Sequence, residues 1–97
     1  NILVQMAPFG PESQQPVFVS NNVYAYRYLS LVKEKHIRFI AKQQDNANTF
    51  NCIGFNMEEF YEGIQDKKPF RMAYTIEENE YNGKTSIQLV IKDIKFD

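Results

Sequence analysis

Apolar and polar residues alternate along most of this chain, as in strands that bury one side. Residues 36–44, HIRFIAKQQ, place Ile37, Phe39 and Ala41 on one side of a predicted strand. The other side of that strand carries His36, Arg38, Ile40 and Lys42. Residues 16–32 are rich in β-branched and aromatic side chains and predict one long strand or two short ones. Residues 49–55 predict a third strand, and Gly54 near its end favours a bulge or bend.

The period of the apolar residues changes after residue 56 from that of a strand to that of a helix. Four side chains recur at i, i+3, i+4 and i+7 and share one helical face: Met57, Phe60, Tyr61 and Ile64. Asn56 is the predicted N-cap, and Glu59 stands in the capping-box position. We therefore expect a helix over residues 57–65.

Two further alternating segments, residues 70–76 and 85–94, flank Asn82-Gly83, a strong signal for a two-residue hairpin turn. The predicted order is three strands, a helix and two strands. This order matches the OB-fold, an all-β, five-stranded, partly open barrel, and we expect the helix to plug one end. An SH3-like barrel is the competing fold, but it usually lacks the helix. We assign residues 17–97 to this domain, after a linker over residues 1–16 that holds the end of a preceding helix and a Pro/Gly turn.

An OB-fold commonly binds ligands across its second and third strands, between the loops that flank them. We expect these loops at residues 28–35 and at the Asn82-Gly83 tip. Cations on the second strand, beside aromatic and amide groups on the third, are the mixture that single-stranded nucleic acid requires. The predicted nucleic-acid-binding residues are Lys35, His36, Arg38, Lys42, Asn51, Phe55, Tyr81 and Lys84.

Composition and charge refine this picture. The chain has 97 residues, 43% of them apolar and 24% charged, which suits one globular domain. Its formal net charge is −1, yet residues 24–42 hold five bases against one acid, and residues 43–97 hold six bases against ten acids. Such asymmetry can steer an anion to one face, although chance clustering on a solvated surface is the alternative. No membrane-spanning run or signal peptide is evident, and a single cysteine fits a reducing compartment.

Other candidate chemistry is sparse. His36 has no second ligand at metal-binding spacing, so we predict no metal or cofactor in this chain. Cys52 alternates with Phe50 and Gly54 and is expected in the core. No nucleophile–base pair, phosphate loop or metal constellation occurs, so we assign no catalytic residue.

Two clusters keep more than one interpretation. Tyr24, Tyr26 and Tyr28 recur at every second position and should share one side of the first strand, either for packing or for base stacking. The second cluster consists of the acids Glu77, Glu78 and Glu80. We expect a solvated acidic edge; the alternatives are that these acids repel DNA from the side of the domain that does not bind it, or that they face a basic partner.

Nearly the whole chain resembles the OB-type domain of the RecJ family of single-stranded-DNA-specific exonucleases. The resemblance rests on APFGP before the PVFVS strand, then HIRFIAKQ, FNCIGFNMEE and YTIEENEYNGKTSIQLVIKDIK, in this order and spacing. The sequence departs from the family at two places. The linker reads PFGPESQQP where the family usually has PFGPGNP, and Tyr81 stands where the family usually has Trp on the last hairpin.

The resemblance implies a parent enzyme with a DHH-type phosphoesterase core, two Mn²⁺ or Mg²⁺ ions, and 5′ to 3′ degradation of single-stranded DNA in recombination and repair. It implies the bacterial cytoplasm, and an OB domain that holds DNA beside the catalytic domains of the same chain. The metal ligands lie in the DHH region, so the 97 residues alone are expected to be inactive. The alternative is a structural or protein-interaction OB module that clamps neighbouring domains.

Overall fold

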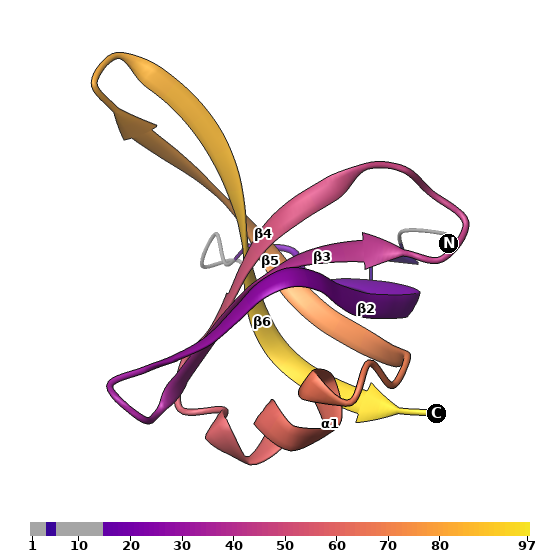
Figure 1. The fold of residues 1–97 in the computed structure, drawn as a ribbon. Helices are drawn as coiled ribbons and strands as arrows, with labels where there is room; N and C mark the ends of the chain where they lie inside the picture. Colours follow the sequence, from indigo (N-terminus) through magenta and orange to yellow (C-terminus); the bar gives the residue numbers. More distant parts are fainter. Residues whose placement is uncertain (1–3, 6–14) are drawn as a thin grey trace.

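The computed structural model describes residues 4–5 and 15–97, and this part of the chain is all-β with one short helix (Figure 1). The strands are β1 (Val4–Gln5), β2 (Phe18–Val32), β3 (His36–Gln43), β4 (Thr49–Gly54), β5 (Phe70–Tyr81) and β6 (Lys84–Phe96). A 3₁₀ turn, η1 (Glu58–Phe60), and the helix α1 (Tyr61–Gln65) lie between β4 and β5. The predicted order of three strands, a helix and two strands is therefore confirmed, with β1 added in front.

Five of these strands close into a ring. β2 pairs with β3, β3 with β4, β4 with β6 and β6 with β5, and β5 returns to β2. The β4–β6 pair is parallel and the others are antiparallel. Closure gives every one of the five strands a partner on both sides, which removes most unpaired backbone edges. The arrangement is that of an OB-fold, as the sequence predicts.

The interior of the ring is packed with the apolar side of each strand. Ile37, Phe39 and Ala41 are buried, as the alternation in β3 requires, and the ring of Phe39 meets Phe70 edge-on at 6.1 Å. Ile64 of α1 is completely buried and closes one end of the ring. A side chain at Gly63 would collide with the ring of Phe96, so any other residue there would force this ring to shift.

The helical segment is shorter than the sequence predicts, and its cap is different. The apolar period covers residues 57–64, but its first turn is 3₁₀ and only Tyr61–Gln65 is α-helical. Asn56 does not cap the segment, because its φ is +56° and Met57 takes the position before η1 without a side-chain hydrogen bond. The Asn56 N–H instead donates to Nδ1 of His36 at 3.0 Å, which ties the loop to β3.

The first expected loop, residues 28–35, is also much shorter. β2 continues to Val32 and pairs with β3 as far as His36, so only residues 33–35 connect the two strands. Lys33 and Glu34 have φ of +54° and +60°, and Lys35 N–H donates to the Val32 carbonyl at 3.0 Å. Positive φ at both central residues is the tight hairpin turn that matches strand twist. The sequence pattern missed this turn because it lacks glycine.

Residues 4–5 form a strand rather than the end of a helix. Val4 and Gln5 pair antiparallel with Val19 and Phe18 of β2. The first residues of β2 have a free edge that an extended segment can satisfy with backbone hydrogen bonds. The predicted Pro/Gly turn lies outside the described residues, and the domain boundary at residue 17 stays a prediction.

The last hairpin extends beyond the ring as a two-stranded arm (Figure 1). β5 pairs with β2 only over residues 70–74, and β6 pairs with β4 only over residues 88–90. Beyond these points β5 and β6 pair with each other alone, up to Tyr81 and Lys84. Asn82 and Gly83 close the arm with φ of +52° and +77°, as the two-residue turn requires. We call residues 75–88 the arm.

Candidate nucleic-acid interface

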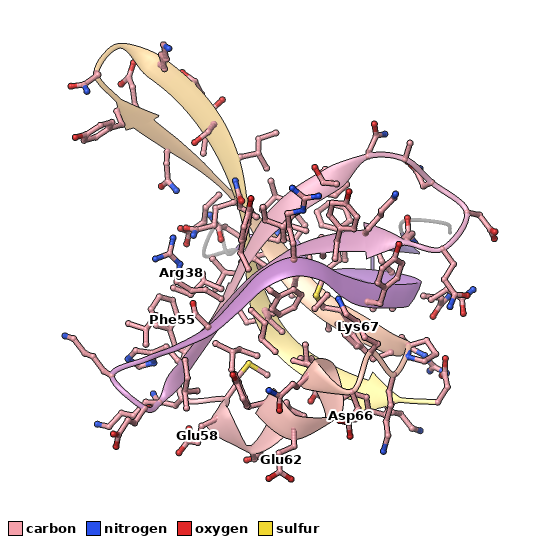
Figure 2. All side chains as sticks on the ribbon, viewed as in Figure 1. Arg38, Phe55, Glu58, Glu62, Asp66 and Lys67 are labelled. Carbon is pink, nitrogen blue, oxygen red and sulfur yellow. The ribbon has the colours of Figure 1, made fainter. Side chains whose placement is uncertain are left out.

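The outer side of β3 brings most of the predicted binding residues onto one surface. Arg38 is opposite Ile53 of β4, and Ile40 is opposite Asn51, so cations and the amide of β4 share one side of the ring. Figure 2 shows Arg38 and Phe55 on the same side of the molecule, whereas Glu62 of α1 lies at the bottom. We call this surface the outer face. It comprises Tyr24, Arg27, Ser30, Arg38, Ile40, Lys42, Asn51, Ile53 and Phe55.

One end of the outer face is aromatic. Phe55 is 54% exposed, and the His36 ring meets it edge-on at 5.3 Å between centroids. His36 Nδ1 already accepts the Asn56 N–H, which fixes the orientation of the imidazole. His36 therefore supports Phe55, while Lys35 stands exposed in the adjacent turn. Phe55 is the ring that this end presents to a base.

A polar depression of about 280 Å³ lies in the outer face. Arg38 and Asn51 line it together with Tyr28 of β2 and Gln88 of β6. Cationic, amide and aromatic groups thus converge there from four neighbouring strands. These are the groups that bind phosphates and sugars or stack on bases.

The two predicted residues at the hairpin tip are not part of this cluster. Glu77 and Gln88 are paired where the arm leaves the ring, and Tyr81 lies four residues further along β5. At about 3.3 Å per residue this places Tyr81 roughly 13 Å beyond the ring. Tyr81 is 78% exposed and Lys84 pairs with it across the arm. A ligand on the outer face would reach Tyr81 and Lys84 only by running along the arm.

The structure adds three residues that were not among the predicted binding residues: Tyr26, Arg27 and Tyr28. The Arg27 guanidinium carbon lies 4.5 Å from the centroid of the Tyr26 ring and 5.4 Å from that of Tyr28. Its nitrogens donate to the Tyr26 hydroxyl at 3.0 Å and, more weakly, to the Tyr28 hydroxyl at 3.5 Å. Lys42 Nζ lies 4.8 Å from the centroid of the same Tyr26 ring. The signal in the sequence was a cation enclosed by alternating tyrosines, YAYRY.

A bulge in β2 explains why the simple alternation of Tyr24, Tyr26 and Tyr28 fails. Ala25 pairs with Ala41, but the next paired residue is Arg27, opposite Ile40, so Tyr26 is the extra residue. Arg27 thereby joins Tyr24 on the outer face, and the ring of the extra residue, Tyr26, lies beside Arg27 and Lys42.

Tyr28 has φ of +63°, a left-handed conformation that costs about 1–2 kcal/mol for a residue with a side chain. It follows the bulge directly, where a second register shift separates Arg27 from Ser30. Strained residues of this kind concentrate at functional sites. The ring is 69% exposed, so packing against the core does not account for the strain.

No metal or nucleophilic site accompanies the outer face within residues 4–5 and 15–97. In this part of the chain no three His, Cys, Asp or Glu side chains are arranged to hold a metal ion. Cys52 is buried in the core, as predicted, and this burial raises the pKa of its thiol to about 12. Cys52 is therefore protonated at neutral pH and unsuited to nucleophilic chemistry.

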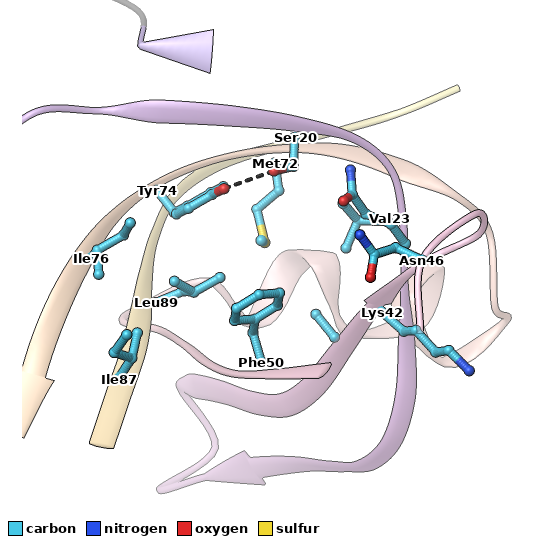
Figure 3. Close-up of a pocket in the computed structure, with 12 residues that line it drawn as sticks. Ser20, Val23, Lys42, Asn46, Phe50, Met72, Tyr74, Ile76, Ile87 and Leu89 are labelled. Atoms are coloured by element: carbon cyan, nitrogen blue, oxygen red, sulfur yellow. Dashed lines mark hydrogen bonds between the residues drawn. The ribbon is translucent and has the colours of Figure 1, made fainter. Parts of the chain in front are cut away.

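A second, apolar pocket of about 250 Å³ opens at the end of the ring where the arm begins (Figure 3). We call it the mouth. Phe50 points into it, and Ile76, Ile87 and Leu89 of the arm and β6 line one side. The Ser20 and Tyr74 hydroxyls are hydrogen-bonded at 2.7 Å in its wall. The mouth is chemically distinct from the polar depression in the outer face.

The closed ring of strands, the short helix below it and the cationic outer face define an OB-type domain. The chain belongs to the RecJ OB domain family, whose model matches residues 1–93. It is 25% identical over 95 residues to the single-stranded-DNA-specific exonuclease RecJ of Dickeya dadantii (strain 3937), which covers 96% of this chain. It is 28% identical over 89 residues to the enzyme of the same name from Bacillus subtilis (strain 168), which covers 91% of this chain.

The match spans only a small part of these relatives, 16% of the Dickeya protein and 11% of the Bacillus protein. No solved structure gives a significant match to the chain. Among the residues that the structure describes, no helix has the length and apolar character needed to span a membrane.

Proposed function

We propose that this chain is the single-stranded-DNA-binding domain of a RecJ-like 5′ to 3′ exonuclease that acts in recombination and repair in the bacterial cytoplasm. The observation that carries the proposal is the outer face, where Arg38 and Lys42 stand beside Asn51 and exposed Phe55. Cations attract phosphates and release condensed counterions, while rings stack on bases of any sequence. A nuclease that degrades any strand needs such sequence-tolerant contacts.

Catalysis is assigned to another part of the parent protein. The described residues offer no group of metal ligands, whereas the relatives that are named exonucleases are several times longer than the matched segment. Phosphodiester hydrolysis with two divalent ions requires converging carboxylates or histidines. Mn²⁺ or Mg²⁺ would therefore be held outside the described residues of this chain, and this domain would hold the DNA strand.

Fluorescence anisotropy with a labelled oligothymidylate, at several salt concentrations, tests the proposal directly. Lys42→Ala should weaken binding and flatten the slope of log K against log salt by about 0.7, the contribution of one phosphate contact to a single strand. Arg71→Ala is the matched control, because Arg71 is an exposed cation on β5, which is not among the three strands of the outer face. If unmodified protein fails to bind, or both variants weaken it equally, the outer face is not the binding surface.

A second candidate function is docking of another part of the parent protein, and the mouth favours it. Phe50 is 43% exposed and Ile87 is 51% exposed, unusual for apolar side chains that line one pocket. Glu78 lies directly opposite Ile87 on the arm, and Glu80 follows on the same side. The acids would repel DNA and attract a basic segment. We therefore assign the mouth to an apolar and basic segment of the parent chain outside residues 1–97.

Zero-length carbodiimide cross-linking of the full-length parent tests this assignment. Glu78 should form amide cross-links to lysines outside residues 1–97 of the same molecule. Glu78→Gln combined with Glu80→Gln should remove them, while Glu62→Gln, on the exposed side of α1, should not. Cross-links that join only isotopically distinct copies, or persist in the double variant, would contradict it.

A further inference from the structure

Arg27 occupies a central position among the cations of the outer face. It lies opposite Ile40, and Ile40 separates Arg38 from Lys42 along β3. Diagonal neighbours on adjacent antiparallel strands are about 7–8 Å apart, so Arg27 is a close neighbour of both β3 cations. Three cations from two strands therefore surround a single apolar residue. The sequence pattern does not show this grouping, because only the bulge brings Arg27 into register with Ile40.

The guanidinium of Arg27 is held in place and keeps its charge. Its hydrogen-bond acceptors are the hydroxyls of Tyr26 and Tyr28, and neither is a carboxylate. Two of its five N–H donors are used in this way, which leaves the others for a ligand. The two rings restrict its movement through cation–π contacts. An arginine that is oriented before binding loses less side-chain entropy when it meets a phosphate.

The backbone beneath Arg27 is also held by a specific contact. Lys67, just after α1, donates its Nζ to the carbonyl oxygens of Ala25 at 2.6 Å and Tyr26 at 3.3 Å. These carbonyls flank the bulge, where ladder pairing is interrupted. The bulge is thus supported by a side chain from a remote segment. The bulge at Tyr26 and the left-handed conformation of Tyr28 both interrupt the regular backbone of β2 beside Arg27.

We propose that Arg27 is a pre-oriented phosphodiester-binding residue, which forms one anion-binding site with Arg38 and Lys42 and extends the DNA path from β3 onto β2. Tyr26 and Tyr28 are positioning residues in this site: their hydroxyls and rings orient Arg27, and they do not serve primarily as platforms for bases. The inference rests on the proposed binding of single-stranded DNA and names a site within it that includes residues outside the predicted set.

The test compares Arg27→Gln, Arg27→Lys and Tyr26→Phe with Arg38→Ala by anisotropy on oligothymidylate over a range of salt. Arg27→Gln should weaken binding on the order of tenfold and reduce the salt slope by about 0.7. Arg27→Lys should retain the slope but bind more weakly, since an ammonium cannot bridge both hydroxyls. Tyr26→Phe keeps the ring and every charge, so it should weaken binding a few-fold at unchanged slope. An oligomer with a neutral methylphosphonate backbone should bind all forms equally weakly.

Tyr28→Gly separates structure from function at this site. Glycine accepts positive φ without strain, so the midpoint of urea unfolding should hold or rise while DNA binding weakens. Loss of both would mean that Tyr28 is a packing residue.

The outcomes separate the two proposals. If Arg27→Gln binds as the unmodified protein does while Arg38→Ala binds weakly, the Arg27 site is wrong and the DNA-binding proposal stands. If Tyr26→Phe has no effect but Tyr26→Ala weakens binding at constant slope, the ring stacks on a base and does not position Arg27. If the unmodified domain does not bind the strand at all, both proposals fail. Arg27 is exposed on the surface, and the urea midpoint of each variant checks that the fold is intact.

Discussion

Replacing Tyr81 by alanine should weaken DNA binding in a way that depends on the length of the strand. Tyr81 lies near the tip of the arm, roughly 13 Å beyond the last residues that pair with the ring. A short DNA oligonucleotide bound on the outer face does not span this distance, whereas a longer oligonucleotide can continue along the arm. We therefore expect the tyrosine to contribute only once the strand is long enough to reach it.

The size of the effect follows from the exposure of the ring. A base stacked on an aromatic side chain contributes about 1–3 kcal/mol. Tyr81 is 78% exposed, and Glu77 lies on the same side of the arm. Both features place the contribution at the low end, about 1 kcal/mol, which is roughly a fivefold change in affinity. The salt slope should stay constant because the substitution removes no charge.

The assay is anisotropy with oligothymidylates of about 4, 8 and 16 nucleotides, the range of site sizes of single OB-folds. Tyr81→Ala should bind the shortest strand normally and the longest about fivefold more weakly, and Tyr81→Phe should match the unmodified domain at every length. Tyr81 does not stack on a distant base if the alanine variant loses the same factor on all three oligonucleotides, or loses none on the longest. An equal loss in the phenylalanine variant would point to the hydroxyl instead of stacking.

Three further predictions concern the interior and the chemistry of the domain. Tyr74→Phe leaves the buried Ser20 hydroxyl without its partner and should lower the free energy of unfolding by about 1–3 kcal/mol in urea, with part recovered in the Ser20→Ala double variant. Cys52 should not react with a thiol reagent at about pH 8 until urea unfolds the domain, since burial raises its pKa; rapid native labelling would contradict this. The purified 97-residue chain should not cleave single-stranded DNA with Mn²⁺; activity that scales with its concentration through further purification would disprove this.

The sequence predicts those parts of the fold that depend on local pattern. Alternation in β3 correctly separates the buried residues from Arg38 and Lys42, because the strand is regular over its length. Asn82-Gly83 correctly predicts the last turn, because both residues tolerate positive φ. The apolar spacing correctly identifies Ile64 as the core contact of the helical segment.

The parts that the sequence does not predict depend on contacts between distant segments. The bulge in β2 arises from pairing with β3 and from the contact of Lys67 with the carbonyls of Ala25 and Tyr26, which lie 42 and 41 residues away. No periodicity within β2 reveals this register. Arg27 was consequently absent from the predicted site, although its charge was included in the basic segment.

The predictions of the helix N-cap and of the length of the first loop fail for related reasons. Glu59 in a capping-box position favours Asn56 as N-cap, but tertiary packing draws Asn56 into a left-handed turn against His36. The turn after Val32 has positive φ at Lys33 and Glu34, residues that carry no turn signal. Propensity alone places a longer loop there, and strand pairing overrides it.

The two faces of the arm explain why acids and an exposed tyrosine meet at one hairpin. Tyr81, Lys84 and Gln88 share one side of the arm, and through Gln88 this side joins Asn51 on the outer face. Glu78 and Glu80 lie on the opposite side, which continues the apolar wall of the mouth through Ile76 and Ile87.

A DNA strand that follows the outer face onto the arm would therefore pass the Tyr81 side chain and Lys84. Glu78 and Glu80 would lie on the other side of the arm, away from the DNA. The mouth would remain free for a basic protein segment at the same time. The two surfaces share Lys42, which lines the mouth as well as the outer face, but their other residues differ, so DNA binding and docking within the parent protein are compatible. A net charge of −1 then reflects two opposed surfaces, and it is no argument against a DNA-binding domain.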